Sequence, residues 1–300
     1  FIDLTILKKS IIPLFLISFL TLFLVPFIGE EVKGSKRWLD LYLFRLQPIE
    51  LIKPFFILIT AKILTMEELK TSMKSYLFSF LVLLSIIILL VNQPDIGQSI
   101  LLIGTWISIV FISGISLIYI ISFFSFSALS LIGLVLSFPD KFSYITNRLK
   151  TFFDPSKGDS FQSQKALDAI KQGGLKGQGM GEGILKDSVP EAHTDYIIAV
   201  ISEEFGSIIS ILLILVFLYI AFNIIKFTVA EIDKNLKISL CGLSSLLIFQ
   251  MFIHIGVNTS LLPTTGMTLP FLSYGGSSLI GSSILAGVIL NFTRDRFTNE

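Results

Sequence analysis

The chain has 300 residues, of which 53% are hydrophobic and 15% are charged. A typical soluble domain is about 45–50% apolar and about 25% charged, so this chain has too few polar side chains to cover its surface in water. Composition therefore excludes a soluble enzyme, a disordered chain and a nucleic-acid-binding protein. The formal net charge of +1 also gives no positive electrostatic field that would attract a polyanion. The single cysteine, Cys241, excludes an intrachain disulfide and a zinc cluster.

Apolar segments long enough to cross a bilayer recur along the chain, since a spanning helix needs about 20 such residues. We therefore predict an all-α, polytopic integral membrane protein with about eight transmembrane helices, in a single membrane domain over residues 1–300. Two longer polar segments, 139–206 and 258–275, are predicted to be outer loops. The expected spans are 11–28, 47–66, 75–91, 96–113, 116–137, 207–226, 238–257 and 276–293.

Basic residues set the expected orientation, because cytoplasmic loops carry an excess of Lys and Arg. With the first residue in the cytoplasm, the cations that fall inside are Lys8, Lys9, Lys62, Lys70, Lys74, Lys226, Lys234, Lys237, Arg294 and Arg296. A cluster in the first outer loop departs from the rule: Lys33, Lys36, Arg37 and Arg45. It could bind an anionic lipid head group or be neutralised by nearby carboxylates, and position alone favours neutralisation.

The second expected span begins with a polar motif, Gln47-Pro48-Ile49-Glu50-Leu51-Ile52-Lys53. Pro48 suits a helix start because its missing N–H would have no intrahelical partner there. Glu50 and Lys53 stand at i,i+3, so they share a helix face and can pair. An ionisable pair at membrane depth usually faces a cavity or another helix, which leaves a structural salt bridge and a substrate contact both open.

Polar residues at two further helices predict structural roles. Gln93-Pro94-Asp95 stands at the outer end of the third span, and Asp95 near the next helix start would favour the helix dipole. In the seventh span, Gln250 and His254 stand at i,i+4 and are expected to make hydrogen bonds between helices.

The segment 139–206 ends with His193-Thr194-Asp195 and an apolar run that is too short to span before Glu203-Glu204. This pattern predicts a half-helix or re-entrant segment packed within protein. Asp195 could be its N-cap, or a general base whose pKa is raised in a low-dielectric cleft, and the two roles are compatible.

The same segment carries a glycine-rich run, Gly173 to Gly183. The spacing is not G-x-G-x-x-G and no strand precedes it, so it is not a dinucleotide fingerprint. Its backbone amides could cradle a pyrophosphate, although a flexible connector is the commoner meaning of such a run.

These motifs stand in a fixed order: Gly34-Ser35-Lys36-Arg37-Trp38, Gln47-Pro48-x-Glu50-x-x-Lys53, Gln93-Pro94-Asp95, Phe161-Gln162, Gly177-x-Gly179, Pro190-Glu191-Ala192-His193-Thr194-Asp195-Tyr196, Glu203-Glu204-x-Gly206 and a segment from Leu262 to Ser277 that includes Ser273-Tyr274. Each is weak alone, but the ordered set resembles the SEDS family of polytopic cell-wall polymerases, which includes FtsW and RodA, over nearly the whole chain. The Glu-Ala-His-Thr-Asp motif and the Thr-Leu-Pro…Ser-Tyr-Gly-Gly-Ser-Ser ending are more similar to the division branch, FtsW, than to the elongation branch, RodA.

The resemblance implies a peptidoglycan glycosyltransferase of the bacterial cytoplasmic (inner) membrane that polymerises lipid II, an undecaprenyl-pyrophosphate-linked disaccharide-pentapeptide, at the outer face. The family's catalytic aspartate maps onto Asp195. It also implies partners, a class B penicillin-binding protein and other division proteins, in addition to the lipid bilayer. No tightly bound cofactor is expected, although a divalent cation (Mg or Mn) could assist. The expected substrate-binding residues are Lys36, Arg37, Trp38, Gln47, Glu50, Lys53, Gln93, Asp95, Gln162, His193, Thr194, Ser273 and Tyr274.

The chain departs from the family pattern in two respects. Family members usually have ten spans, and the motifs place 11–28 as the third, so the first two are expected to be absent here. The family tyrosine before the loop glutamine is Phe161. Two other functions remain open: a lipid II transporter (flippase), which would need no outer general base, and a non-catalytic scaffold of the division machinery.

Overall fold

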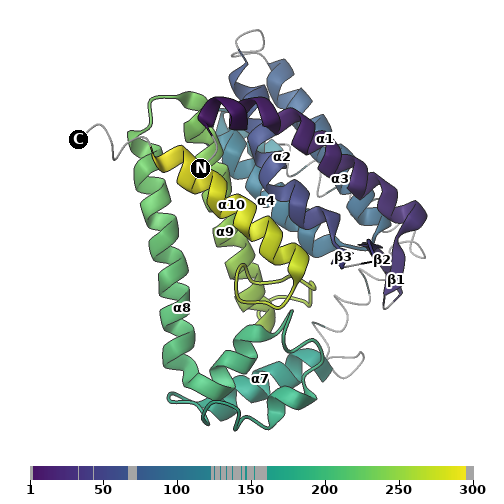
Figure 1. Cartoon of the computed structure of the whole chain (residues 1–300), viewed down its shortest axis with the longest axis vertical. Coiled ribbons are helices and arrows are strands. Elements are labelled where there is room, and N and C mark those ends of the chain that lie inside the picture. The colour runs from purple at the N-terminus through teal and green to yellow at the C-terminus, as the bar shows by residue number, and fades with distance from the viewer. Residues whose placement is uncertain are drawn as a thin grey trace. The chain divides into compact units, whose positions relative to one another are not determined.

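The computed structural model describes residues 3–294, apart from 33, 43, 67–72 and most of 123–160 (Figure 1). The chain divides into two compact units, which are described separately. Unit 1 comprises Phe1–Ser113, Phe217–Gln250 and Pro270–Glu300, and unit 2 comprises Gly114–Val216 and Met251–Leu269.

Unit 1 is a helical bundle built around one central helix, α2 (Pro48–Thr65). This helix packs against α1 (Leu4–Ile28), α3 (Met73–Asn92), α4 (Ile96–Ile112) and α10 (Gly276–Arg294) (Figure 1). Because neighbours surround it, 13 of its 18 residues are buried, including Glu50 and Lys53. The polar start of α2 is therefore held inside the bundle.

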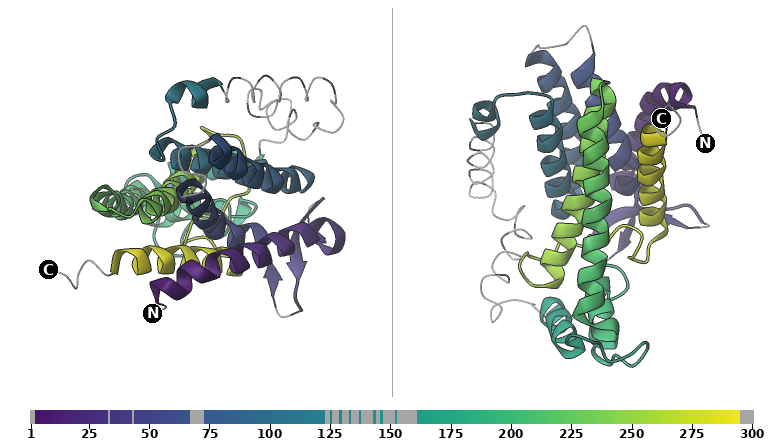
Figure 2. Two further views of the ribbon diagram at one scale, coloured as in Figure 1. Left: turned by 90° about the horizontal axis from the view of Figure 1, so that it is seen from above. Right: turned by 90° about the vertical axis from the view of Figure 1, so that its left-hand side faces the viewer.

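A small antiparallel sheet joins α1 to α2, an element that the all-α prediction did not include. It consists of β1 (Glu30–Val32), β2 (Ser35–Asp40) and β3 (Arg45–Leu46), in the order β1-β2-β3. Figure 2 shows the hairpin of β1 and β2 beyond the end of α1. Gly34, with a φ of 76°, provides the left-handed turn between these strands. Of the expected outer cation cluster, Lys36 and Arg37 thus lie on β2 and Arg45 lies on β3, whereas Lys33 lies outside the described residues.

The helices confirm a multi-pass membrane fold. Among the described residues, five helices are long and apolar enough to cross a membrane: α1, α3, α8 (Ile197–Ala230), α9 (Lys234–Asn258) and α10. The predicted spans at 47–66 and 96–113 correspond to α2, which carries three charged residues, and to the shorter apolar helix α4. Half of the predicted span 116–137 lies outside the described residues. Large apolar side chains on α8, such as Leu212 and Phe222, are exposed, as expected for a helix that faces lipid.

In unit 2, the described part of the expected loop 139–206 contains helices. It contains α7 (Phe161–Gly173), the 3₁₀ turn η3 (Leu185–Ser188) and the start of α8. Ala166 and Ala169 recur at helical spacing and are fully buried, which lets α7 approach its neighbours closely. The shared core of unit 2 consists of Ala166, Ala169, Val189, Ala192, Tyr196, Ala199, Val200 and Val257.

Candidate functional site

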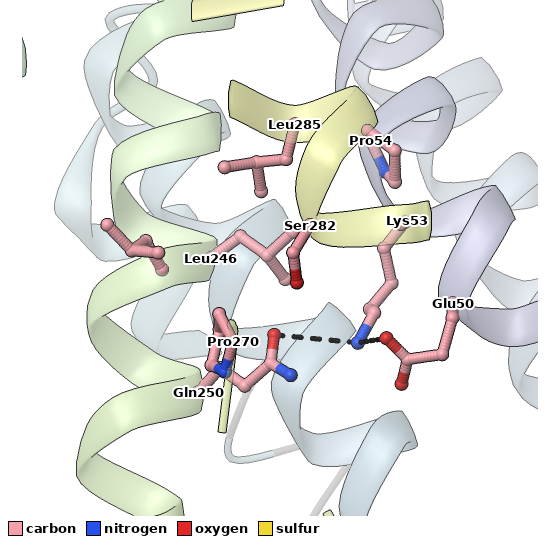
Figure 3. Close-up of a pocket in the computed structure, with 10 residues that line it drawn as sticks. Glu50, Lys53, Pro54, Leu246, Gln250, Pro270, Ser282 and Leu285 are labelled. Atoms are coloured by element: carbon pink, nitrogen blue, oxygen red, sulfur yellow. Dashed lines mark hydrogen bonds and ion pairs between the residues drawn. The ribbon is translucent and has the colours of Figure 1, made fainter. Parts of the chain in front are cut away.

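A buried ion pair lies near the start of α2. Lys53 Nζ lies 2.8 Å from Glu50 Oε2, and the two side chains are 3% and 2% exposed. Lys53 also donates to Gln250 Oε1 of α9 at 3.5 Å (Figure 3), and Gln98 of α4 donates to Glu50 Oε1 at 3.0 Å. The predicted pairing is confirmed, and both charges are stabilised by amides from neighbouring helices.

Helix α10 closes the space beside this pair. Gly281 comes so close that a Cβ atom would overlap the Glu50 carbonyl oxygen, so only glycine fits there. The remaining cavity is about 10 Å³, about the space for one water molecule. It is lined by Glu50, Lys53, Pro54, Leu246, Leu247, Gln250, Pro270, Gly281, Ser282 and Leu285. Because a lipid-linked sugar cannot enter so small a space, this conformation favours a structural salt bridge over a substrate contact.

The Gln93-Pro94-Asp95 turn is held by hydrogen bonds from Arg37 of β2. The Arg37 Nε donates to the Gln93 carbonyl at 3.0 Å, and its Nη2 donates to the Pro94 carbonyl. Asp95 is the N-cap of α4, and its side chain accepts the Gln98 N–H at 3.4 Å. The predicted structural role is therefore confirmed. Burial raises the pKa of Asp95, although the nearby positive charge of Arg37 opposes the shift.

The other cations and polar residues of the first outer loop differ in their surroundings: some are bonded or buried within the protein, and others are exposed. Arg45 Nη2 lies 2.8 Å from Glu30 Oε1, so neutralisation is confirmed for this cation. Lys36 is exposed and Trp38 is half-buried. Gln47 is buried at the N-cap of α2.

The end of unit 1 that follows Pro270 contains two more predicted site residues. Ser273 is buried, whereas Tyr274 is 81% exposed. Nearby in sequence, the Ser277 hydroxyl accepts the Gln47 N–H at 2.9 Å and donates to the Arg45 carbonyl at 3.1 Å. The start of α10 is thus bonded to the start of α2.

In unit 2, Asp195 ends a tight turn that leads into α8. The N–H groups of Thr194, Asp195 and Tyr196 donate to the Glu191 carbonyl at 3.1, 3.0 and 3.2 Å. The Asp195 carbonyl accepts a hydrogen bond from Asn258 Nδ2 at 3.0 Å. Both backbone groups of Asp195 are therefore bonded, and its side chain is half-buried.

Three other predicted site residues also belong to unit 2. His193 is exposed, and Thr194 Oγ1 donates to the Glu191 carboxylate at 2.9 Å. Gln162 is half-buried on α7. The structure thus places Gln162, His193, Thr194 and Asp195 in unit 2.

The predicted half-helix is present at the start of α8. Helix α8 begins at Ile197, so Tyr196 rather than Asp195 stands directly before its first residue. At Gly206 the backbone leaves helical geometry, with φ 84° and ψ 169°, before the long apolar part of α8 continues. The helical turns between Ile197 and Gly206 are therefore a short separate piece.

The glycine-rich run 173–183 is docked against this break and is not a loose connector. The N–H groups of Gln178 and Gly179 donate to the carbonyls of Glu203 and Glu204 at 2.8 and 3.0 Å. The Ser207 N–H donates back to the run at 2.9 Å, to the carbonyl of residue 174. This corrects the expectation of a flexible connector.

Close backbone approach explains the glycines. A Cβ atom on Gly173, Gly177 or Gly206 would overlap backbone atoms of the opposite segment, and Gly177 and Gly206 also have positive φ. The carboxylates of Glu203 and Glu204 accept the N–H groups of Leu185 and residue 181 at 2.8 and 3.2 Å. These amides are occupied by the protein, which argues against a pyrophosphate cradle in this run.

Among the predicted residues of unit 1, the structure brings Glu50 and Lys53 into one buried network and Arg37, Gln93 and Asp95 into one turn, whereas the side chains of Lys36 and Tyr274 are exposed. The sequence reasoning missed Gln98 as the partner of Glu50 and Asn258 as the partner of Asp195, and it placed Gln250 without its partner Lys53. A single amide in an apolar helix carries no periodic signal. Its burial at membrane depth, where an unpaired amide is costly, is the one clue that could have singled it out.

Metal ligands do not gather in the part of the chain that the structure describes. No group of three or more His, Cys, Asp or Glu residues there could hold a metal ion. A protein cage for a divalent cation is thus absent from the described residues.

These features define a multi-pass helical membrane protein with a buried polar network in one unit and a fixed carboxylate-bearing turn in the other. The family model for the FtsW/RodA/SpoVE cell cycle proteins matches residues 1–297. The chain belongs to this family.

Relatives and solved structures agree with that membership. A probable peptidoglycan glycosyltransferase FtsW of Caulobacter vibrioides is 34% identical over 272 residues, which are 91% of this chain and 69% of that protein. Stage V sporulation protein E of Bacillus subtilis is 35% identical over 280 residues, or 92% of this chain and 76% of that protein. A solved chain from a peptidoglycan synthase complex that coordinates polymerization and crosslinking has a TM-score of 0.80 and 27% identity, covering 100% of this chain and 85% of its own. The rod shape determining protein RodA of Thermus thermophilus has a TM-score of 0.68 and 25% identity, covering 100% of this chain and 82% of its own.

Proposed function

We propose that this protein is a peptidoglycan glycosyltransferase that polymerises lipid II at the outer face of the bacterial cytoplasmic membrane during cell division. The observation that carries the proposal is Asp195: a half-buried carboxylate on a turn whose backbone is bonded on both sides, at the start of a short helix. The family membership adds that its relatives include proteins named as probable peptidoglycan glycosyltransferases.

In this proposal Asp195 is the general base of glycosyl transfer. Its carboxylate takes the proton of the acceptor sugar hydroxyl as that oxygen attacks the anomeric carbon of the donor. The new C–O bond forms as the bond from the anomeric carbon to the pyrophosphate oxygen breaks, and the undecaprenyl pyrophosphate leaves. A positioned base typically contributes about 10²–10⁴-fold to such a step.

Phosphate charge on the substrate needs a cation. Arg37 donates to two backbone carbonyls and Lys53 is buried beside Glu50, whereas Lys36 is exposed. Of the three candidate cations, Lys36 is thus the one whose exposed side chain is accessible to an anionic group. A divalent cation, Mg²⁺ or Mn²⁺, would arrive with the substrate phosphates, since magnesium sites are commonly completed by phosphate oxygens.

The proposed partner is a class B penicillin-binding protein, which would cross-link the new glycan, together with other division proteins. A related solved chain belongs to a peptidoglycan synthase complex, which supports such an assembly. The test is polymerisation of purified lipid II by the purified protein, alone and with this partner. Glycan strands visible on a gel are expected. Translocation of lipid II across vesicles without any polymer would favour the transporter alternative instead.

A further inference from the structure

Asn258, the last residue of α9, is fully buried in unit 2, with 0% exposure. Its Nδ2 donates to the Asp195 carbonyl at 3.0 Å and to the His254 carbonyl at 2.8 Å, while its Oδ1 accepts the Ala199 N–H at 3.1 Å. Both amide protons and the amide oxygen are therefore in use. Two of these three bonds go to the turn before α8 and to its first turn.

The Asp195 carbonyl and the Ala199 N–H, which Asn258 contacts, would be partners of each other in a continuous helix. In an α-helix the N–H of residue 199 would donate to the carbonyl four residues earlier, which is that of Asp195. Here the Asn258 carboxamide bonds to both groups and takes the place of that helical hydrogen bond. The Ala199 N–H is shared, since it also donates to the Tyr196 carbonyl, three residues earlier, at 2.9 Å. Asn258 therefore stops the helix from extending back through Asp195.

We propose that Asn258 is a positioning residue for glycosyl transfer: it holds Asp195 outside the helix and fixes its backbone for proton abstraction. This inference rests on the proposed role of Asp195 as the base. The Asp195 N–H is already bonded to the Glu191 carbonyl at 3.0 Å, so the Asn258 bond fixes the other side of the same residue. Catalytic groups need placement to within about 0.5 Å.

Loss of this carboxamide should let the Ala199 N–H bond directly to the Asp195 carbonyl and pull Asp195 into the helix. A displacement of about 1 Å can cost about 10²-fold in rate. We therefore expect Asn258→Ala to lower kcat for lipid II polymerisation by about 10- to 100-fold with KM little changed. Asn258→Asp keeps the acceptor for the Ala199 N–H but loses both donors, so it should lose kcat as well.

The matched control is Thr259→Val, one residue further along. Thr259, just beyond α9, donates from Oγ1 to the Ile255 carbonyl in the last turn of that helix at 2.8 Å, so its removal leaves the Asp195 bond intact. The kinetics are measured with the partner transpeptidase on monodisperse protein of equal folded fraction. Asn258→Ser replaces any variant that does not purify in this form. A wild-type kcat in the Asn258 variants, or a change confined to KM or melting temperature, would overturn the positioning role.

A structure of the Asn258→Ala protein, obtained by cryo-electron microscopy of the same complex, separates this inference from the proposed function. We expect a direct bond from the Ala199 N–H to the Asp195 carbonyl and a shifted Asp195. An unshifted Asp195 would refute the inference even if wild type is active. If wild type makes no glycan, the proposed function fails, and the position of Asp195 still decides whether Asn258 holds this turn.

Discussion

The buried pair of Glu50 and Lys53 gives the most quantitative prediction for stability. The two side chains are 2% and 3% exposed and lie 2.8 Å apart. Lys53→Met removes one charge and leaves the other buried without its counter-ion, which typically costs about 3–5 kcal/mol. That is a large part of the roughly 5–15 kcal/mol that commonly separates folded from unfolded protein. Glu50→Gln should have a similar effect for the same reason.

The assay is the yield of monodisperse protein together with its thermal unfolding midpoint in detergent. The control is Lys8→Met, which breaks an exposed pair: Lys8 Nζ lies 3.1 Å from Asp233 Oδ2, and the two side chains are 38% and 42% exposed. Such surface pairs contribute about 0–1 kcal/mol, so this variant should unfold close to wild type. Wild-type yield and midpoint in both Lys53→Met and Glu50→Gln would refute the buried-pair reasoning.

A charge swap, Glu50→Lys with Lys53→Glu, separates structure from substrate binding. The neighbouring amides can rotate to exchange donor and acceptor ends. Gln98 can do so readily, because its Oε1 has no hydrogen-bond partner among the described residues. The swapped protein should therefore fold and keep activity if the pair is structural. A folded but inactive swap would instead indicate a substrate contact.

Two further predictions concern other parts of the chain. Gly177→Ala should loosen the contact between the glycine run and the break in α8, because the φ of Gly177 is +81° and a Cβ would overlap the Glu204 carbonyl. Limited proteolysis should cleave this variant faster than the control Gly287→Ala, where a Cβ meets nothing within 4 Å. Equal cleavage rates would contradict the docking of the glycine run. Partial burial raises the pKa of Asp233, but hydrogen bonds from Lys8 and backbone amides outweigh this effect and lower the pKa. Ionised Asp233 therefore stabilises the folded state slightly. This stabilisation is present above the unfolded pKa of about 3.9 and is lost as pH falls through the folded pKa. The midpoint difference between wild type and Asp233→Asn should thus be constant from neutral pH to about 5 and shrink below about 4; a difference that grows in acid would contradict the sign.

Local pattern was enough to predict many elements of the fold. Apolar length located the spans, Pro48 marked the start of α2, and i,i+3 spacing paired Glu50 with Lys53. Asp95 at a helix start and a short helical piece after Asp195 were also predicted correctly. Each of these features depends on residues within one or two turns of each other, where spacing alone decides the geometry.

Long-range contacts were not predictable in the same way. Gln98 is 48 residues from Glu50, and Asn258 is 59 residues from Ala199. The glycine run was predicted to be flexible because nothing in its own sequence indicates that it packs against residues 203–207. The short strands of the first outer loop likewise depend on pairing between β1, β2 and β3. Resemblance to a family, and not local pattern, singled out Asp195 from its neighbours.

The central claim is that Asp195 is the base of glycosyl transfer, and Asp195→Asn tests it most directly. Asparagine keeps the size of the side chain and a hydrogen-bond-accepting oxygen, so a purely structural role predicts nearly normal activity. The measurement is glycan length on a gel, from purified lipid II, for wild type and Asp195→Asn in complex with the partner transpeptidase. Our account predicts a variant that folds and binds the partner but makes no glycan, consistent with loss of about 10²–10⁴-fold in rate. Polymer formation by Asp195→Asn within a few-fold of wild type would contradict it.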